Sequence, residues 1–129
     1  MVMSWYGLIA VGAGAMVGAW LRWWFGLLGN PVFPTLPLGT LAANLVGGYL
    51  MGLAMAMFAD HPGLPPEARL LLATGFLGGL TTFSTFSAET VTLLLRAQYA
   101  WAGGIIAIHV AGSVAMTLLG IGTVKLLKG

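Results

Sequence analysis

The sequence has no cysteine and very little charge. Its 129 residues include five Lys or Arg and three Asp or Glu, so 6% of the chain is charged. Without cysteine there is no disulfide framework. The net charge of +2 is small and scattered, so no nucleic-acid partner is expected. A soluble domain of this length cannot cover its surface with so few charges, which makes the chain an integral membrane protein.

The hydrophobic residues, 59% of the chain, lie in long uncharged runs. A membrane-spanning helix needs about 20 predominantly apolar residues. In the longest run, Pro31, Pro34 and Pro37 punctuate the first half, so this run supplies a loop and one helix. The sequence therefore predicts an all-α integral membrane protein, one domain over residues 1–129, with four transmembrane helices near 4–27, 38–59, 67–95 and 100–125.

The distribution of basic residues leaves the orientation in the membrane open. Four spans place both termini on one side, which holds Arg69, Lys125 and Lys128, whereas the other side holds Arg22 and Arg96. Three against two is a weak positive-inside bias. Insertion in both orientations, which permits antiparallel dimers, and insertion in one orientation are both compatible with it.

Glycine is frequent, and part of it recurs at four-residue spacing. Gly14 with Gly18, and Gly48 with Gly52, give small residues on one helical face. Such pairs allow transmembrane backbones to approach closely, in the same chain or between chains. Because a single four-helix bundle leaves little interior for a polar pathway, we favour an oligomer.

The third span contains a run that a simple membrane anchor does not need. Residues 75–86 read GFLGGLTTFSTF. In hydrocarbon, a helix is broken only where the freed backbone groups meet protein, water or ions. We expect the break at Gly78-Gly79, with a hydroxyl of Thr81 or Thr82 capping the next helix. The carbonyls of Gly78 and Thr81 can then coordinate a small hard cation such as Na⁺. The alternative is an unbroken helix whose glycines only ease packing.

Two phenylalanines follow the expected break. Phe83 and Phe86 lie three residues apart, on one helical face, and Thr82, Ser84 and Thr85 add hydroxyls on adjoining faces. Phenylalanine is usually a packing residue. The edge of an aromatic ring, however, carries the positive part of its quadrupole. Two ring edges can therefore line a narrow path for a small anion without a fixed positive charge.

Polar side chains also occur in the second and fourth spans. Asn44 either makes an interhelical hydrogen bond or lines an ion path. His109, Ser113 and Thr117 follow one another at i, i+4 and i+8, which places them in a stripe along one face. Three such residues in register favour a polar track over isolated helix contacts.

The remaining charges in the spans have ordinary roles available. For Glu89 we favour the role of an interfacial carboxylate or of one paired with a polar neighbour. The alternative role is proton coupling or gating in a transporter. Arg22 is first an interfacial anchor and second a charge that attracts anions. His109 has no acidic partner within its span, and no nucleophile or phosphate-binding motif is present. An enzyme is therefore not expected.

The assembled motifs resemble the Fluc (CrcB) family of bacterial fluoride channels. The resemblance covers essentially the whole chain, and residues 75–87 are its most specific part. It implies an antiparallel dual-topology homodimer in the bacterial cytoplasmic membrane, which exports fluoride passively and protects the cell from fluoride toxicity. The other matching motifs are Gly18-Ala19-x-x-Arg22, Gly39-Thr40-Leu41-Ala42-Ala43-Asn44 and Ser113-x-x-x-Thr117.

The resemblance also implies roles for individual residues. A structural Na⁺ at the dimer centre is held by the backbone carbonyls of Gly78 and Thr81. Arg22 is the family's anion-facing arginine, and Thr40 and Glu89 are accessory residues. The first position of the fourth-span track is a tyrosine in some members and His109 here. The implied fluoride pathway consists of Asn44, Phe83, Ser84, Thr85, Phe86, His109, Ser113 and Thr117.

Two other classes of protein compete with this interpretation. A small proton-coupled multidrug transporter is also built from four short spans in an antiparallel dimer. It needs a carboxylate in the centre of its binding chamber, and Glu89 is the one candidate in any span. A non-transporting membrane subunit has no need for a helix break combined with a polar track.

Overall fold

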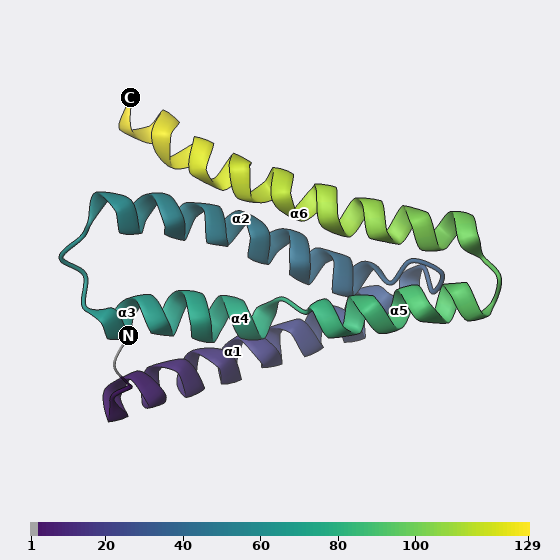
Figure 1. Ribbon diagram of the computed structural model, residues 1–129, viewed down its shortest axis with the longest axis horizontal. Coiled ribbons are helices and arrows are strands. Elements are labelled where there is room, and N and C mark those ends of the chain that lie inside the picture. The colour runs from purple at the N-terminus through teal and green to yellow at the C-terminus, as the bar shows by residue number, and fades with distance from the viewer. Residues whose placement is uncertain (1–2) are drawn as a thin grey trace.

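A computed structural model describes residues 3–129 as four long helical segments that run alternately up and down (Figure 1). The start of α1, the C-terminus and the connection after residue 60 lie at the same end of the molecule. Four helices are long and apolar enough to cross a membrane, which confirms the four predicted spans. The elements are α1 (Trp5–Gly29), η1 (Asn30–Val32), α2 (Leu38–Asp60), α3 (Pro66–Arg69), η2 (Leu70–Leu77), α4 (Gly78–Leu80), α5 (Phe83–Leu95) and α6 (Tyr99–Lys128).

The helix ends follow local sequence signals. Ser4 caps α1, because its hydroxyl accepts a hydrogen bond from the Gly7 amide at 3.0 Å. Pro37 precedes the first residue of α2, and Pro66 is the first residue of α3, where its missing amide hydrogen costs nothing. Proline at these positions sets where the second and third segments begin.

The helices pack as two pairs. The first half of the third segment, η2 with α4, lies along α1, while α2 lies along α6. One small core forms from Ala43, Leu77 and Leu80, and a second contains Phe86 and Ile105. Many large apolar side chains face outward on all four segments, as lipid contact requires.

Both predicted glycine pairs make close helix contacts, and their partners belong to the same chain. A Cβ atom on Gly18 would lie 2.1 Å from the Phe76 carbonyl oxygen. One on Gly52 would lie 2.0 Å from the carbonyl oxygen of Thr117. These distances leave no room for a methyl group, so glycine is required where α1 meets η2 and where α2 meets α6.

The prediction that helical geometry fails at Gly78-Gly79 is wrong. Both glycines are helical, and the extended residues are Thr81 (φ −89°, ψ 156°) and Thr82 (φ −148°, ψ 117°). Gly79 serves close packing instead, because its Cβ would lie 2.4 Å from the Ala15 carbonyl oxygen. The β-branched threonines favour extended backbone, so the non-helical residues lie just after the glycine pair.

Candidate ion pathway

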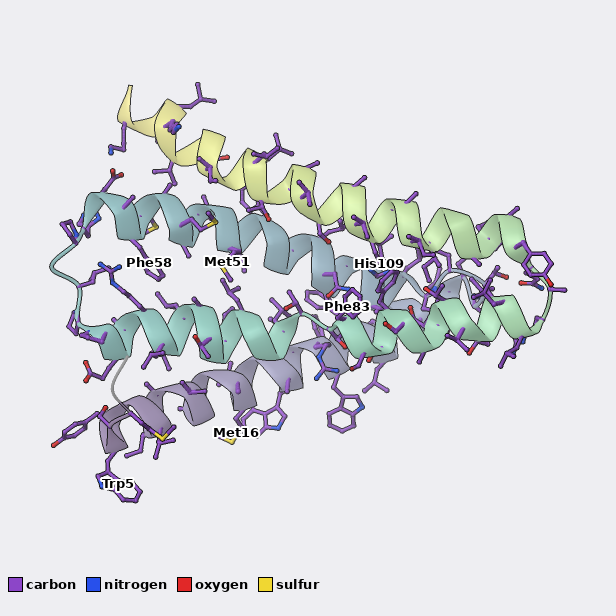
Figure 2. The ribbon with its side chains drawn as sticks, in the orientation of Figure 1. Trp5, Met16, Met51, Phe58, Phe83 and His109 are labelled. Carbon is purple, nitrogen blue, oxygen red and sulfur yellow. The ribbon has the colours of Figure 1, made fainter. Side chains whose placement is uncertain are left out.

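A cavity of about 420 Å³ lies between α2, the η2–α4 segment, α5 and α6. No Lys, Arg, Asp or Glu side chain lines it among residues 3–129. Figure 2 shows two of its lining residues, Phe83 and His109, near the middle of the molecule. The predicted site residues that line it are Asn44, Gly78, Thr81, Phe83, Phe86, His109, Ser113 and Thr117.

Asn44 on α2 forms two hydrogen bonds with the backbone of the extended residue Thr82. The Thr82 amide donates to Asn44 Oδ1 at 2.7 Å, and Asn44 Nδ2 donates to the Thr82 carbonyl at 3.1 Å. The amide side chain thus gives the Thr82 N–H its acceptor and adds a donor to the Thr82 carbonyl, which as the N-cap carbonyl also begins the hydrogen bonding of α5. Asn44 Nδ2 also lies 3.0 Å from His109 Nδ1. Asn44 therefore makes interhelical hydrogen bonds and lines the cavity as well, so both of its predicted roles fit its position.

Thr82 was not singled out as a site residue from the sequence, although it joins the two halves of the third segment. Its Oγ1 accepts a hydrogen bond from the Thr85 amide at 3.1 Å, which confirms a threonine cap at the start of α5. The Thr81 hydroxyl instead donates back to the Leu77 carbonyl at 2.8 Å. The sequence pattern that could have predicted this role is the pair Thr81-Thr82 directly before Phe83, the first residue of α5.

The extended pair changes which backbone carbonyls have donors. The amide of Thr82 bonds Asn44, and that of Thr85 bonds the Thr82 hydroxyl. The carbonyls of Gly78 and Thr81, four residues earlier, therefore lose the donors that a continuous helix provides. Both residues line the cavity.

Arg22 lies outside the cavity lining, beside the end of α4. Its Nε donates to the carbonyl oxygen of Gly79 at 2.9 Å. A positive charge is favourable at the carbonyl end of a helix. In the part of the chain that the structure describes, the one ion pair joins Lys128 to Asp60 at 2.5 Å, so Arg22 forms none. Arg22 supports the backbone at α4 in this structure, a role that the sequence analysis missed.

Three rings stand in sequence along the cavity. Phe83 and Phe86 meet edge to face, with centroids 5.4 Å apart and an interplanar angle of 72°. Phe86 stacks on the His109 ring at 4.7 Å and 30°. Phe83 is 77% exposed, whereas Phe86 and His109 are 6% and 3% exposed. The Phe83 ring is therefore exposed beside a buried pair of rings, Phe86 and His109.

The predicted stripe on the fourth span lies along the cavity, but its members differ in what they can donate. The Thr117 hydroxyl already donates to the Gly48 carbonyl at 2.9 Å and to the Ser113 carbonyl at 3.0 Å. Its hydrogen is committed to the helix pair. Ser113 is half-buried and lines the cavity. His109 lines the cavity with Nε2 buried and unpartnered among the described residues.

Five predicted site residues are not part of the cavity lining: Arg22, described above, and Thr40, Ser84, Thr85 and Glu89 on α2 and α5. Ser84 is exposed and lies 3.4 Å from Thr82 Oγ1, and Thr85 contributes its backbone to the helix cap. The Thr40 hydroxyl donates to Glu89 Oε2 at 2.6 Å. Glu89 is thus paired with a polar neighbour, as one of its predicted roles requires. Within residues 3–129, no three His, Cys, Asp or Glu side chains gather as a metal site.

Comparison with known proteins identifies one family. Residues 9–121 match the family model described as CrcB-like protein, Camphor Resistance (CrcB). A fluoride-specific ion channel FluC of Nitrosospira multiformis is 70% identical over 123 residues, which cover 95% of this chain and 96% of that protein. Proteins with the same name from Tolumonas auensis and Cupriavidus necator are 60% and 59% identical, over 95% and 94% of the chain and 97% and 96% of their own lengths.

Proposed function

The chain belongs to the CrcB family, and on this premise we propose that it is a fluoride-selective ion channel. It conducts fluoride passively out of the cell and thereby protects the cell from fluoride toxicity. The observation that carries the proposal is a cavity lined by aromatic rings and polar side chains, with no charged side chain among the described residues that line it. The relatives that are 59–70% identical carry the name of a fluoride-specific ion channel. The protein is a channel and not an enzyme.

A neutral lining suits rapid passage of a small anion. Phe83 and Phe86 contribute aromatic rings, whose edges carry partial positive charge, and His109 and Ser113 contribute polar groups to the same lining. A Lys or Arg in the same place would bind the anion strongly and slow its release. Conduction requires binding that is favourable enough to enter and weak enough to leave.

We further propose that the working unit is an antiparallel homodimer whose chains insert in both orientations. Phe83 stands 77% exposed beside the cavity, and a second copy placed against this face would complete the wall. The three-to-two division of basic residues between the two sides supports dual insertion, because it gives either orientation little advantage. The expected location is the bacterial cytoplasmic membrane, as a multi-pass protein.

We propose that a structural Na⁺ binds at the centre of this dimer. The carbonyls of Gly78 and Thr81 have lost their helical donors, and carbonyls of non-helical membrane segments are suitable ligands for Na⁺. One chain supplies too few oxygens, whereas a two-fold axis doubles the set. When bound, the ion would hold the two copies together at the extended residues.

The alternative, a proton-coupled multidrug transporter, fits the geometry less well. It requires a carboxylate in the central chamber, but Glu89 is outside the cavity lining and its Oε2 accepts a hydrogen bond from Thr40. The observed position of Glu89 therefore favours the channel.

The proposal is tested by fluoride efflux from liposomes. Purified protein is reconstituted in vesicles loaded with potassium fluoride, valinomycin starts the flux, and an electrode records fluoride. We expect fast fluoride release and no chloride release from chloride-loaded vesicles. Absence of fluoride release from folded protein would overturn the proposal.

Replacement of either cavity phenylalanine by isoleucine tests the pathway. We expect Phe83→Ile and Phe86→Ile to abolish fluoride efflux, because an aliphatic side chain keeps the bulk but has no ring edge. Phe33→Ile is the matched control, since the Phe33 ring lies outside the cavity and packs on Trp101 at 5.5 Å. Unchanged flux in the first two variants would remove these rings from the mechanism.

A further inference from the structure

The orientation of the Asn44 amide is fixed by the backbone it bonds. A backbone amide only donates and a carbonyl only accepts. Because the Thr82 amide lies 2.7 Å from one end of the Asn44 side chain and the Thr82 carbonyl 3.1 Å from the other, the oxygen must face the amide and the nitrogen the carbonyl. Exchange of the two ends would oppose like groups at both contacts. The group of Asn44 that faces His109 is therefore the NH₂ donor.

The fixed donor decides the state of the His109 ring. Asn44 Nδ2 has two hydrogens, one directed at the Thr82 carbonyl and the other at His109 Nδ1, 3.0 Å away. Nδ1 must accept this second hydrogen, so it carries none of its own. In a neutral imidazole the proton then resides on Nε2. A doubly protonated ring would place two donors against each other at Nδ1.

Among residues 3–129 of one chain, the proton on Nε2 has no acceptor. Nε2 is buried and unpartnered among the described residues, the side chain is 3% exposed, and the ring lines the cavity. An N–H group left unpaired at such a depth is costly unless a ligand or water accepts it. Stacking on Phe86 at 4.7 Å fixes the plane of the ring, and the contact with Asn44 fixes which nitrogen faces that residue.

We propose that Thr82 and Asn44 hold His109 as the neutral Nε2–H tautomer, and that this N–H is a hydrogen-bond donor to the permeating anion. The inference rests on the proposed function, because it names how one residue of that pathway recognises fluoride. Fluoride accepts hydrogen bonds strongly, and a neutral donor binds it without the retention that an imidazolium would cause.

The charges on the surrounding elements leave His109 neutral. On α5 the carboxylate of Glu89 accepts a hydrogen bond from Thr40, and on α1 the Arg22 guanidinium is bonded to Gly79. Between Leu38 and Ala59, α2 has no charged side chain, and its one titratable group, Tyr49, is bonded to Thr123. In the described residues, no carboxylate contacts the imidazole to favour a second proton.

Nitrogen NMR of histidine-labelled protein in lipid tests the tautomer. The chain has two histidines, and His61 Nδ1 lies 2.9 Å from the Met57 carbonyl, which requires the opposite arrangement of the proton. The variant His61→Gln leaves a single labelled ring and assigns the spectrum. At neutral pH we expect protonated Nε2 and bare Nδ1 for His109, and a shift of the Nε2 signal on addition of fluoride but not of chloride. An Nδ1–H or doubly protonated ring, or no response to fluoride, would overturn the proposal.

Flux through substituted channels tests the donor. Glutamine places an N–H close to the position of Nε2, whereas asparagine reaches only the position of Nδ1. We expect His109→Gln to keep fluoride efflux within about threefold of the original chain, and His109→Asn and His109→Leu to lower it about tenfold or more. His61→Gln should not change it, because His61 is exposed at the end of α2.

The two proposals fail in different ways. If the original chain releases no fluoride while the NMR finds the Nε2–H tautomer, the channel function is wrong and the ring assignment stands. If the chain conducts and His109→Leu conducts equally well, the donor role of His109 is wrong and the channel stands. Melting temperatures of all variants identify losses of flux that come from unfolding.

Discussion

The two halves of the third segment are held in place by different physical means. The first half packs against α1 through glycines that have no side chain. At Gly18 and Gly79 the two backbones are so close that an added Cβ atom would overlap the other helix. Against α2 and α6, the second half is fixed by polar groups, with Asn44 bonded to Thr82 and His109 stacked on Phe86. The first contact leaves no space, and the second surrounds a cavity of about 420 Å³.

This difference indicates how the chain combines rigidity with an ion path. A contact made by glycines has no room for an added atom, and it offers an ion no side-chain donor or acceptor. The polar contact provides donors and acceptors but needs an exact set of partners, because an unpaired polar group is costly away from water. Thr81 and Thr82 lie where one kind of contact gives way to the other.

The largest effect is expected from adding one methyl group to the glycine contact. Gly18→Ala places a Cβ 2.1 Å from the Phe76 carbonyl oxygen and 2.7 Å from the Leu80 amide nitrogen, and backbone atoms cannot move aside cheaply. We expect a loss of about 3 kcal/mol of stability, or failure to fold. Thermal unfolding in detergent measures it.

Gly12→Ala is the matched control on the same helix. Nothing lies within 4 Å of a Cβ at Gly12, so the substitution should be neutral or should stabilise the helix by up to about 1 kcal/mol. Equal stability of the Gly12 and Gly18 variants would contradict the account of this contact.

A smaller effect is expected from removing the hydrogen bonds between Asn44 and Thr82. Asn44→Leu leaves the Thr82 amide without its acceptor and removes one donor to the Thr82 carbonyl, which should cost about 2 kcal/mol of stability. Fluoride efflux should fall about tenfold or more, because the start of α5 and the His109 tautomer both depend on Asn44. Efflux and melting temperature are measured on the same preparation.

Asn44→Asp refines this test. The carboxylate still accepts from the Thr82 amide, but it has no donor for the Thr82 carbonyl or for His109 Nδ1. Its stability should therefore lie between that of Asn44→Leu and that of the original chain. A Leu variant that conducts normally would show that the polar contact is dispensable.

The smallest effect is expected outside both regions, between α2 and α6. The Tyr49 hydroxyl donates to Thr123 Oγ1 at 2.9 Å, and Tyr49→Phe removes this hydrogen bond alone. We expect a loss of about 1 kcal/mol in thermal unfolding with unchanged fluoride efflux, because Tyr49 does not line the cavity. Tyr6→Phe, at a side chain 75% exposed, is the control and should change neither. A change in efflux would link this contact to the pathway.

The four spans and half of the residues that line the cavity could be predicted from the sequence. Long apolar runs with few charges predict helices that lie in a lipid bilayer, and the prolines mark where the runs divide into separate helices. The i, i+4, i+8 spacing of His109, Ser113 and Thr117 places them on one face in any helix, so their common position along the cavity was predictable. The same argument applies to Phe83 and Phe86.

The tertiary structure alone decided which backbone and side-chain groups are already occupied. A glycine pair is compatible both with a helix break and with close helix packing. Gly79 packs closely against Ala15 of α1, and the extended backbone lies at Thr82, where Asn44 accepts the hydrogen bond of the amide. A hydrogen bond needs a partner distant in the sequence, which no local pattern specifies. For this reason Arg22 on the Gly79 carbonyl, the committed hydroxyl of Thr117 and the unpartnered Nε2 of His109 were decided by the packing of the helices.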